Sequence, residues 1–247
     1  MIRIPVLQPE SDEAFPAVET ALREPNGLLA AGGDLRPTRL LQAYAQGIFP
    51  WFSPGEPILW WAPDPRMVFA TDAMHVPRRL ARWLSNCDWR ISADGDFAGV
   101  MRACAAPRAG QSGTWITRHM LDAYTQLHEL GHAHSVEVYA GDDCVGGIYG
   151  VAIGRMFFGE SMFSRASNGS KVALLALAHR LRSWGWPLLD AQVSSAHLQT
   201  LGALELPRAE FCRRIAGLVT QPGRTGTWHE DFATLRPSSL ALPCPIR

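Results

Sequence analysis

Residues 134–160 read HSVEVYAGDDCVGGIYGVAIGRMFFGE, and this stretch decides the fold. Residues 134–139 alternate between polar and apolar side chains as a half-buried strand does, and the AGDD sequence at 140–143 supplies a turn. A second strand is predicted over residues 144–153 and a third over residues 155–160. The sequence therefore predicts a β-hairpin that is followed at once by another strand.

The segments downstream extend this pattern. The loop SRASNGS at 164–170 opens a long helix that is predicted to run from about residue 170 to 184. An apolar strand follows at 187–192, and another helix begins at 196–201. Hairpin, strand, helix, strand and helix is the element order of an N-acyltransferase core. We therefore predict an α/β (α+β) fold whose larger part is an acetyltransferase-like mixed sheet.

The first 66 residues differ in composition, because they are rich in Pro, Gly and Trp. A helix is predicted from Pro37, which suits a first helical turn, to Gly47, which ends it. Residues 47–66, GIFPWFSPGEPILWWAPDPR, are interrupted by proline too often to predict regular elements. We predict a small N-terminal domain over residues 1–66, a catalytic domain over 67–236 and a poorly ordered tail over 237–247.

The charge and cysteine content limit the partners and the compartment. With 23 basic and 23 acidic residues the formal net charge is zero, so a nucleic acid would have to bind a local basic patch. The five cysteines are scattered and form no C-x-x-C pair, which indicates reduced thiols. The N-terminus lacks the apolar core of a signal peptide, and no apolar stretch reaches the length of a membrane span. We expect a cytoplasmic protein with no membrane partner.

The run His128-Glu-Leu-Gly-His132 matches the H-E-x-x-H signature of zinc peptidases. That signature needs both histidines one turn apart on a continuous helix. Gly131 is a helix terminator inside the run, and the residues after it alternate like a strand. We therefore favour a structural corner between a helix at 120–130 and a strand over a zinc site, and we expect no metal.

The loop that opens the long helix is a second place where a known motif has to be considered. Acyl-CoA acetyltransferases carry an R/Q-x-x-G-x-G/A sequence at the equivalent place, where backbone N–H groups bind phosphate. After Arg165 the first required glycine is Asn168, so the match fails. A CoA-dependent N-acetyltransferase stays the alternative function, because the element order alone would support it.

Acidic and amide side chains lie at predicted strand ends, where ligands usually bind in α/β sheets. In Asp190-Ala-Gln192 the two polar side chains point to one face of the sheet and the alternate residues to the other. Glu160 is predicted to close the preceding strand. A strand-terminal Asp is also a common helix cap, but an acidic residue in an apolar stretch without a basic neighbour in sequence favours a functional site.

Several segments together are similar to the leucyl/phenylalanyl-tRNA–protein transferase family. They are REPNGLLAAGGDLRPTRLLQAYAQGIFPWFSPGEPILWWAPDPR, GTWIT, LHELGHAHSVEV, VGGIYGVAIG, GESMFS, and LDAQV followed by HLQTLGA. They cover roughly residues 20–207, and their occurrence in this order is highly specific. The family contains the HELGHAH run without being a zinc peptidase.

The resemblance implies an enzyme that moves Leu, Phe and, less well, Met from aminoacyl-tRNA to the N-terminal amine of proteins that begin with Arg or Lys. The product would be marked for proteolysis by the N-degron (N-end rule) route. No cofactor is implied, because the aminoacyl ester is already activated. We expect a monomer.

The resemblance also implies roles for particular residues. Asp190 and Gln192 match the catalytic pair, and Glu160 matches an acid on the acceptor side. Trp51 and Trp115 match aromatic positions near the 3′ end of the donor. Positions that match the pocket for the donor side chain are Ile148, Phe157, Leu174, Leu177, Leu189 and Ala191.

Arg78, Arg79 and Arg82 fall in the region that the family uses to contact tRNA. Residues 75–90 hold four Arg and one Asp, which is a local charge of +3 with His75 neutral. From the residues alone a solvated helix face explains this run equally well. Ser195 stands where an Asn is frequent in the family, so no role is carried over to it.

The chemistry suggests how the pair would act. The acceptor amine must be neutral to attack, and an α-ammonium has a pKa of roughly 7.7–8.0. We hypothesise that the side-chain carbonyl oxygen of Gln192 accepts a hydrogen bond from this amine, and that Asp190 fixes the orientation of the amide. A neutral amide cannot hold the proton, so the proton must end on another group, on water or on the tRNA ribose.

Overall fold

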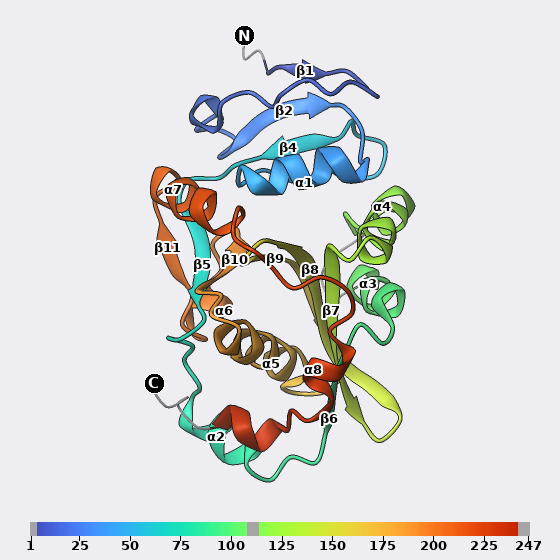
Figure 1. Cartoon of the computed structure of the whole chain (residues 1–247), viewed down its shortest axis with the longest axis vertical. Coiled ribbons are helices and arrows are strands. Elements are labelled where there is room, and N and C mark those ends of the chain that lie inside the picture. The colour runs from blue at the N-terminus through green and yellow to red at the C-terminus, as the bar shows by residue number, and fades with distance from the viewer. Residues whose placement is uncertain (1–3, 108–113, 242–247) are drawn as a thin grey trace.

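A four-stranded sheet forms the N-terminal end of the molecule. The structure is a computed structural model that describes residues 4–107 and 114–241. Strands β1 (Val6–Leu7), β2 (Leu28–Gly32), β3 (Phe49–Pro50) and β4 (Leu59–Trp61) pair in the order β1-β2-β4-β3, and helix α1 (Pro37–Ala45) lies beneath them in Figure 1. The prediction of no regular elements over residues 47–66 is wrong, because β3 and β4 lie there. Pro50 is tolerated because β3 is an edge strand.

The second sheet has seven strands in the order β11-β5-β10-β9-β8-β7-β6. Only β10 and β9 run parallel; the other neighbours are antiparallel. The predicted mixed α/β class is confirmed, and so are the hairpin and the strand after it. The strands are β5 (Arg66–Ala70), β6 (Arg90–Ala93), β7 (Ala133–Ala140), β8 (Asp143–Ile153), β9 (Met156–Ser164), β10 (Leu188–Gln192) and β11 (Leu204–Leu206).

The parallel pair at the centre of this sheet stops early. Pairing of β10 with β9 ends where Asp190 faces Phe158. The register of β9 against β8 shifts around Glu160, which is the extra residue of a β-bulge between Gly159 and Ser161. The prediction that Glu160 closes its strand is therefore wrong, since β9 continues to Ser164. The bulge and the early end of pairing interrupt the hydrogen bonding between the central strands.

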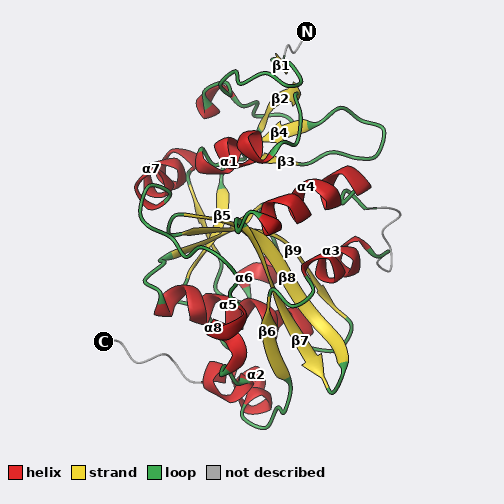
Figure 2. Cartoon of the chain, turned by 45° about the vertical axis from the view of Figure 1, so that its right-hand side comes forward, coloured by secondary structure: helices red, strands yellow, loops and turns green. Residues whose placement is uncertain are grey.

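Helices cover both faces of the seven-stranded sheet (Figures 1 and 2). Helix α5 (Gly169–Ser183) packs on one face, against β7, β8 and β9. The other face carries α3 (Phe97–Ala105) and α4 (Arg118–Glu129), and α1 also reaches β8 there. Two hydrophobic cores result, one on each face. None of the described helices combines the length and the apolar character that a membrane crossing requires.

The C-terminal part of the chain wraps around this body. Helix α7 (Arg208–Leu218) lies beside the N-terminal unit, and α8 (His229–Ala233) packs on β6. The 3₁₀ helix η2 (Pro237–Ala241) packs on α2 (Arg78–Leu84) and on α5, with Leu240 buried. The prediction of a poorly ordered tail is wrong for residues 237–241, and residues 242–247 lie outside the described part. The remaining short helices are η1 (Val18–Thr20) and α6 (Ala196–Gln199).

The HELGHAH run forms the predicted corner. Helix α4 ends at Glu129, and Gly131 follows with φ +77°, so His132 leaves the helical face. His128 stacks on the Phe97 ring at a centroid distance of 4.4 Å. His134 hydrogen-bonds the Asp94 carboxylate through Nδ1 at 2.9 Å. Within residues 4–107 and 114–241 no group of three or more His, Cys, Asp and Glu side chains has the arrangement of a metal site.

Gly47 joins the N-terminal unit to α7. Its φ is +77°, a left-handed conformation that glycine adopts without strain. A Cβ atom at this position would lie only 2.9 Å from Cε1 of the Phe211 ring. The close approach of α7 therefore requires glycine here.

We expect Gly47→Ala to lower the free energy of unfolding by about 2–4 kcal/mol, because left-handed strain adds to overpacking against Phe211. Gly55→Ala is the matched control, since Gly55 has φ +87° and open space around its Cα. It should cost only about 1–2 kcal/mol. Urea unfolding of both variants measures the difference, and equal losses would show that the contact with Phe211 is unimportant.

Candidate active site

The Glu160 carboxylate on β9 contacts side chains from three other elements. Its Oε1 accepts hydrogen bonds from the Tyr44 hydroxyl of α1 at 2.7 Å and from Nε2 of Gln192 on β10 at 2.6 Å. Its Oε2 accepts one from the Tyr124 hydroxyl of α4 at 3.3 Å. The two tyrosine oxygens also lie within hydrogen-bond distance of each other. Each hydroxyl has a single proton, so this contact and both bonds to an ionised Glu160 cannot form at the same time. Glu160 and Gln192, which the sequence predicted as site residues, are thus brought together.

Tyr44 and Tyr124 were not predicted. Both are buried helix residues with the same spacing as core apolar residues, so nothing in the sequence separates them from packing. Because Tyr44 belongs to α1, the N-terminal unit contributes a side chain directly to the site.

The environment changes the acidity of these groups. Burial raises the pKa of Glu160 to about 8, although the hydrogen bonds from Tyr44, Gln192 and Tyr124 lower it. Burial likewise raises the pKa of the Tyr44 and Tyr124 phenols well above the ordinary value of 10. Near neutral pH the phenols therefore stay protonated donors, while Glu160 can exchange a proton.

Asp190 is held in a buried ion pair. The Arg66 guanidinium donates from Nε to Oδ1 at 2.8 Å and from Nη2 to Oδ2 at 2.6 Å, and both side chains are at most 1% exposed. Arg66 also donates from Nη1 to the Gly47 carbonyl oxygen at 2.8 Å. Its guanidinium lies 4.8 Å from the Phe49 ring centroid and 4.7 Å from that of Phe211. Asp190 has no basic neighbour in sequence, as noted above, but its basic partner in the fold is Arg66, 124 positions upstream.

Gln192 is positioned by both acids. Its backbone N–H donates to Oδ1 of Asp190 at 2.9 Å, and its φ is +61°. Its side-chain amide donates to Glu160 instead. The orienting group for the amide is therefore Glu160, which corrects the hypothesis that Asp190 plays this part. No donor within the described chain contacts the Gln192 side-chain carbonyl oxygen, so this oxygen can accept a hydrogen bond from a ligand.

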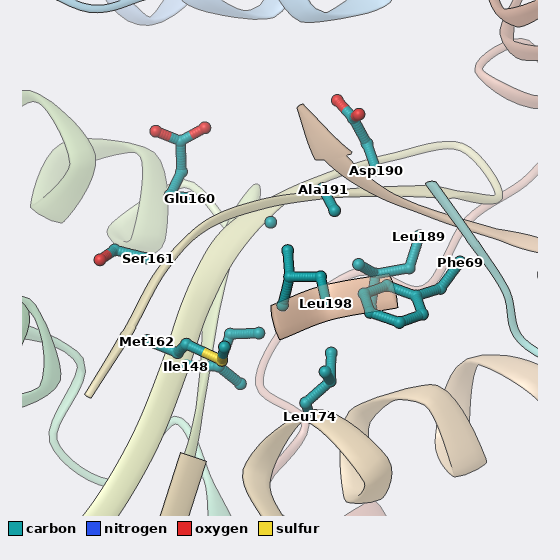
Figure 3. Close-up of a pocket in the computed structure, with 11 residues that line it drawn as sticks. Phe69, Ile148, Glu160, Ser161, Met162, Leu174, Leu189, Asp190, Ala191 and Leu198 are labelled. Carbon is teal, nitrogen blue, oxygen red and sulfur yellow. The ribbon is translucent and has the colours of Figure 1, made fainter. Parts of the chain in front are cut away.

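An apolar pocket lies on the opposite face of the same strands. It encloses about 380 Å³ of empty space, which includes solvent at its mouth. Figure 3 shows Glu160 and Asp190 pointing away from the apolar side chains, to the other side of β9 and β10. The residues that line the apolar pocket are Phe69, Ile148, Gly159, Glu160, Ser161, Met162, Leu174, Leu189, Asp190, Ala191 and Leu198.

Four of the six residues predicted for a donor pocket line this cavity: Ile148, Leu174, Leu189 and Ala191. Phe157 and Leu177 are buried in the core behind it and do not reach its surface. Phe69, Met162 and Leu198 line the pocket but were not predicted. Phe69 faces Leu189 across the pairing of β5 with β10, which is a long-range contact that no local pattern reveals.

The residues predicted to contact RNA lie far apart. Trp51 directly follows β3, is 44% exposed and packs against Trp61 with centroids 5.7 Å apart. Trp115 is partly buried just before α4. Arg78, Arg79 and Arg82 are exposed on α2, at the end of the molecule opposite β3 in Figure 2. The structure therefore does not bring the two aromatic residues and the basic patch together.

We expect Arg66→Met and Asp190→Leu each to lower the free energy of unfolding by about 3–5 kcal/mol, because each leaves a buried charge without its partner. The double variant Arg66→Met/Asp190→Leu should lose much less than the sum. Asp122→Asn, which breaks an exposed pair with Arg118, is the control and should change stability by less than about 1 kcal/mol. Urea unfolding provides the measurement, and additive losses would contradict a coupled pair.

The family models that match this sequence and two of its relatives carry the same family description. A family model described as leucyl/phenylalanyl-tRNA protein transferase matches residues 68–216, and the model of its N-terminal domain matches residues 33–64. A leucyl/phenylalanyl-tRNA–protein transferase of Xanthomonas campestris pv. campestris (strain B100) is 58% identical over 96% of this chain and 95% of its own length. The protein of the same name from Nitrosomonas europaea is 55% identical over 90% of this chain and 94% of its own.

Among solved structures, L-PGS from Bacillus licheniformis aligns with a TM-score of 0.37 and 9% identity over 68% of this chain and 54% of that one. This likeness adds nothing to the comparison.

Proposed function

Since the chain belongs to the leucyl/phenylalanyl-tRNA–protein transferase family, we propose that it transfers Leu, Phe and, less well, Met from aminoacyl-tRNA to proteins that begin with Arg or Lys. The observation that supports this most is that two unlike sites lie on opposite faces of β9 and β10. An apolar pocket lies on one face, and a polar cluster around Glu160 lies on the other. An ester and an amine approaching from these two sides would meet at Gln192.

The pocket suits an apolar donor side chain. Ile148, Leu174, Leu189 and Ala191 line it, with Phe157 and Leu177 behind them as support. Burial of a Leu, Phe or Met side chain contributes roughly 1.5–3 kcal/mol. A charged donor side chain would meet carbon atoms almost everywhere and would lose its hydration without compensation.

Gln192 would orient the acceptor. Its free side-chain carbonyl oxygen accepts a hydrogen bond from the attacking amine, and the ionised fraction of Glu160 would attract a cationic N-terminus. Asp190 would act indirectly, because its carboxylate accepts a hydrogen bond from the backbone N–H of Gln192 and so positions that residue. Orientation of this kind contributes more to the rate than deprotonation, which costs only about 1 kcal/mol at neutral pH.

The RNA would be held at two separate places. Trp51 and Trp115 would stack on bases at the 3′ end, each worth about 1–3 kcal/mol. Arg78, Arg79 and Arg82 would contact phosphates farther along the acceptor stem, which agrees with their exposure and with their distance from the site in Figure 2.

The wider assignment follows from the same premise. The product would carry a destabilising N-terminal residue and enter the N-degron route. We also propose a cytoplasmic monomer that needs no cofactor and is organised as an N-terminal unit over residues 1–66, a catalytic unit over 67–236 and a C-terminal extension over 237–247.

Purified protein supplied with radiolabelled Leu-tRNA or Phe-tRNA should extend a model protein that begins with Arg. The same protein with an acetylated N-terminus is the control and should stay unlabelled, because it offers no free amine. Labelled acetyl-CoA tests the alternative N-acetyltransferase. Acetylation without RNA, together with no transfer from charged tRNA, would overturn the proposal.

We expect the triple variant Arg78→Ala/Arg79→Ala/Arg82→Ala to raise the KM for charged tRNA about tenfold or more while kcat stays within about twofold. Each lost phosphate contact should also make log K against log salt shallower by about 0.7–0.9. Arg213→Ala/Arg214→Ala on α7 is the control, because these arginines are also exposed but pair with Glu210. An unchanged KM in the triple variant would place the RNA contact elsewhere.

A further inference from the structure

We propose that the Glu160 carboxylate is the general base that takes the proton from the α-ammonium group of the acceptor before peptide-bond formation. This inference rests on the proposed function and goes beyond a role for Glu160 in attracting a cation. It makes Glu160 a catalytic residue that touches the reacting nitrogen.

The proton balance of the reaction requires such a group. An α-ammonium carries three protons on nitrogen, and the amide product keeps one. One of the two lost protons goes to the ribose oxygen of the tRNA as the ester C–O bond breaks. The other leaves the ammonium before nitrogen attacks the ester carbonyl carbon. Glu160 takes this proton and releases it to water after the product leaves.

The hydrogen bonds around Glu160 place it beside the nucleophile. Gln192 donates its amide N–H to Oε1 of Glu160 at 2.6 Å, and its side-chain carbonyl oxygen belongs to the same planar amide group. An amine bonded to that oxygen lies next to the Glu160 carboxylate. The hydroxyls of Tyr44 and Tyr124 also donate to Glu160 and therefore stabilise the ionised, proton-accepting form.

The other titratable groups that face Glu160 are unsuited to this step. Tyr44 of α1, Tyr124 of α4 and Tyr149 of β8 are buried phenols whose pKa is raised well above 10, so they hold their protons. Asp190 of β10 has both oxygens bonded to Arg66 and is fully buried. Glu160 is the group in this cluster that can change its protonation state near neutral pH.

The acidity of Glu160 matches the task. Its pKa of about 8, raised by burial, is close to the roughly 7.7–8.0 of an α-ammonium. Proton transfer between the two is therefore nearly balanced, which is the condition under which a general base is most effective. The fraction of ionised Glu160 grows as pH rises through about 8, so turnover should grow in the same range and then level off.

The test compares Glu160→Gln with wild-type protein over pH 6–9.5, with two acceptors that begin with Arg. One carries the ordinary α-amine. In the other an α-hydrazino group replaces it and is already neutral at pH 7. We expect Glu160→Gln to lose about five- to tenfold in kcat with the ordinary amine at pH 7, because only about a tenth of an α-amine with a pKa of roughly 7.7–8.0 is neutral there without a base. The loss should shrink at pH 9.5 and with the hydrazino acceptor, since neither needs a base.

Two further variants control for structure. Glu160→Asp keeps a carboxylate and should lose less activity while it keeps the rise with pH. Glu205→Gln makes the same chemical change on an exposed residue of β11, whose carboxylate accepts from Ser194, and should behave as wild type. Circular dichroism and thermal melting establish that each variant is folded.

The outcomes separate the possible roles of Glu160. A Glu160→Gln variant that raises only KM, or that loses the same factor at every pH and with both acceptors, would overturn the proton transfer and leave the proposed function standing. Failure of the wild-type protein to extend either acceptor would overturn the proposed function and this inference with it.

Discussion

The Arg66 guanidinium lies where the two sheets, α7 and the end of β10 meet, and the geometry of the site depends on it. It donates two hydrogen bonds to the Asp190 carboxylate and one to the Gly47 carbonyl oxygen. The guanidinium itself packs against the rings of Phe49 and Phe211. A buried charge is costly unless its partners are in place, so this ion pair selects one arrangement of the two sheets. Asp190 in turn fixes the backbone of Gln192. Asp190 thus anchors the structure of the site, and we propose that the neighbouring carboxylate of Glu160 is the reactive one.

The central strands separate two kinds of chemistry. Where β10 stops pairing with β9, alternate residues of one short strand face opposite sides of the sheet: Leu189 and Ala191 line an apolar pocket, while Asp190 and Gln192 point to the polar cluster. The bulge at Glu160 turns its carboxylate toward Gln192. In the reaction that we propose, a donor held by its side chain and an acceptor held by its charge would therefore react at one point without sharing a binding surface.

Features that depend on residues close together in the sequence were predicted correctly. The hairpin of β7 and β8, the helix end at Gly131 and the two faces of residues 189–192 all follow from periodicity and from glycine, and the structure has them. The features that were missed depend on contacts distant in sequence. Arg66 meets Asp190 across 124 positions, and Tyr44 meets Glu160 across 116. Strands β3 and β4 were hidden by prolines, and η2 is ordered by its packing on α2 and α5, which its own residues do not indicate.

The hydroxyl of Tyr44 crosses from the N-terminal unit to the carboxylate of the larger sheet. The reactive centre is consequently assembled by docking and is absent from either half alone. A small molecule wedged between α1 and α4, or a substitution that loosened that seam by a few ångströms, would silence the enzyme while leaving its helices and strands intact.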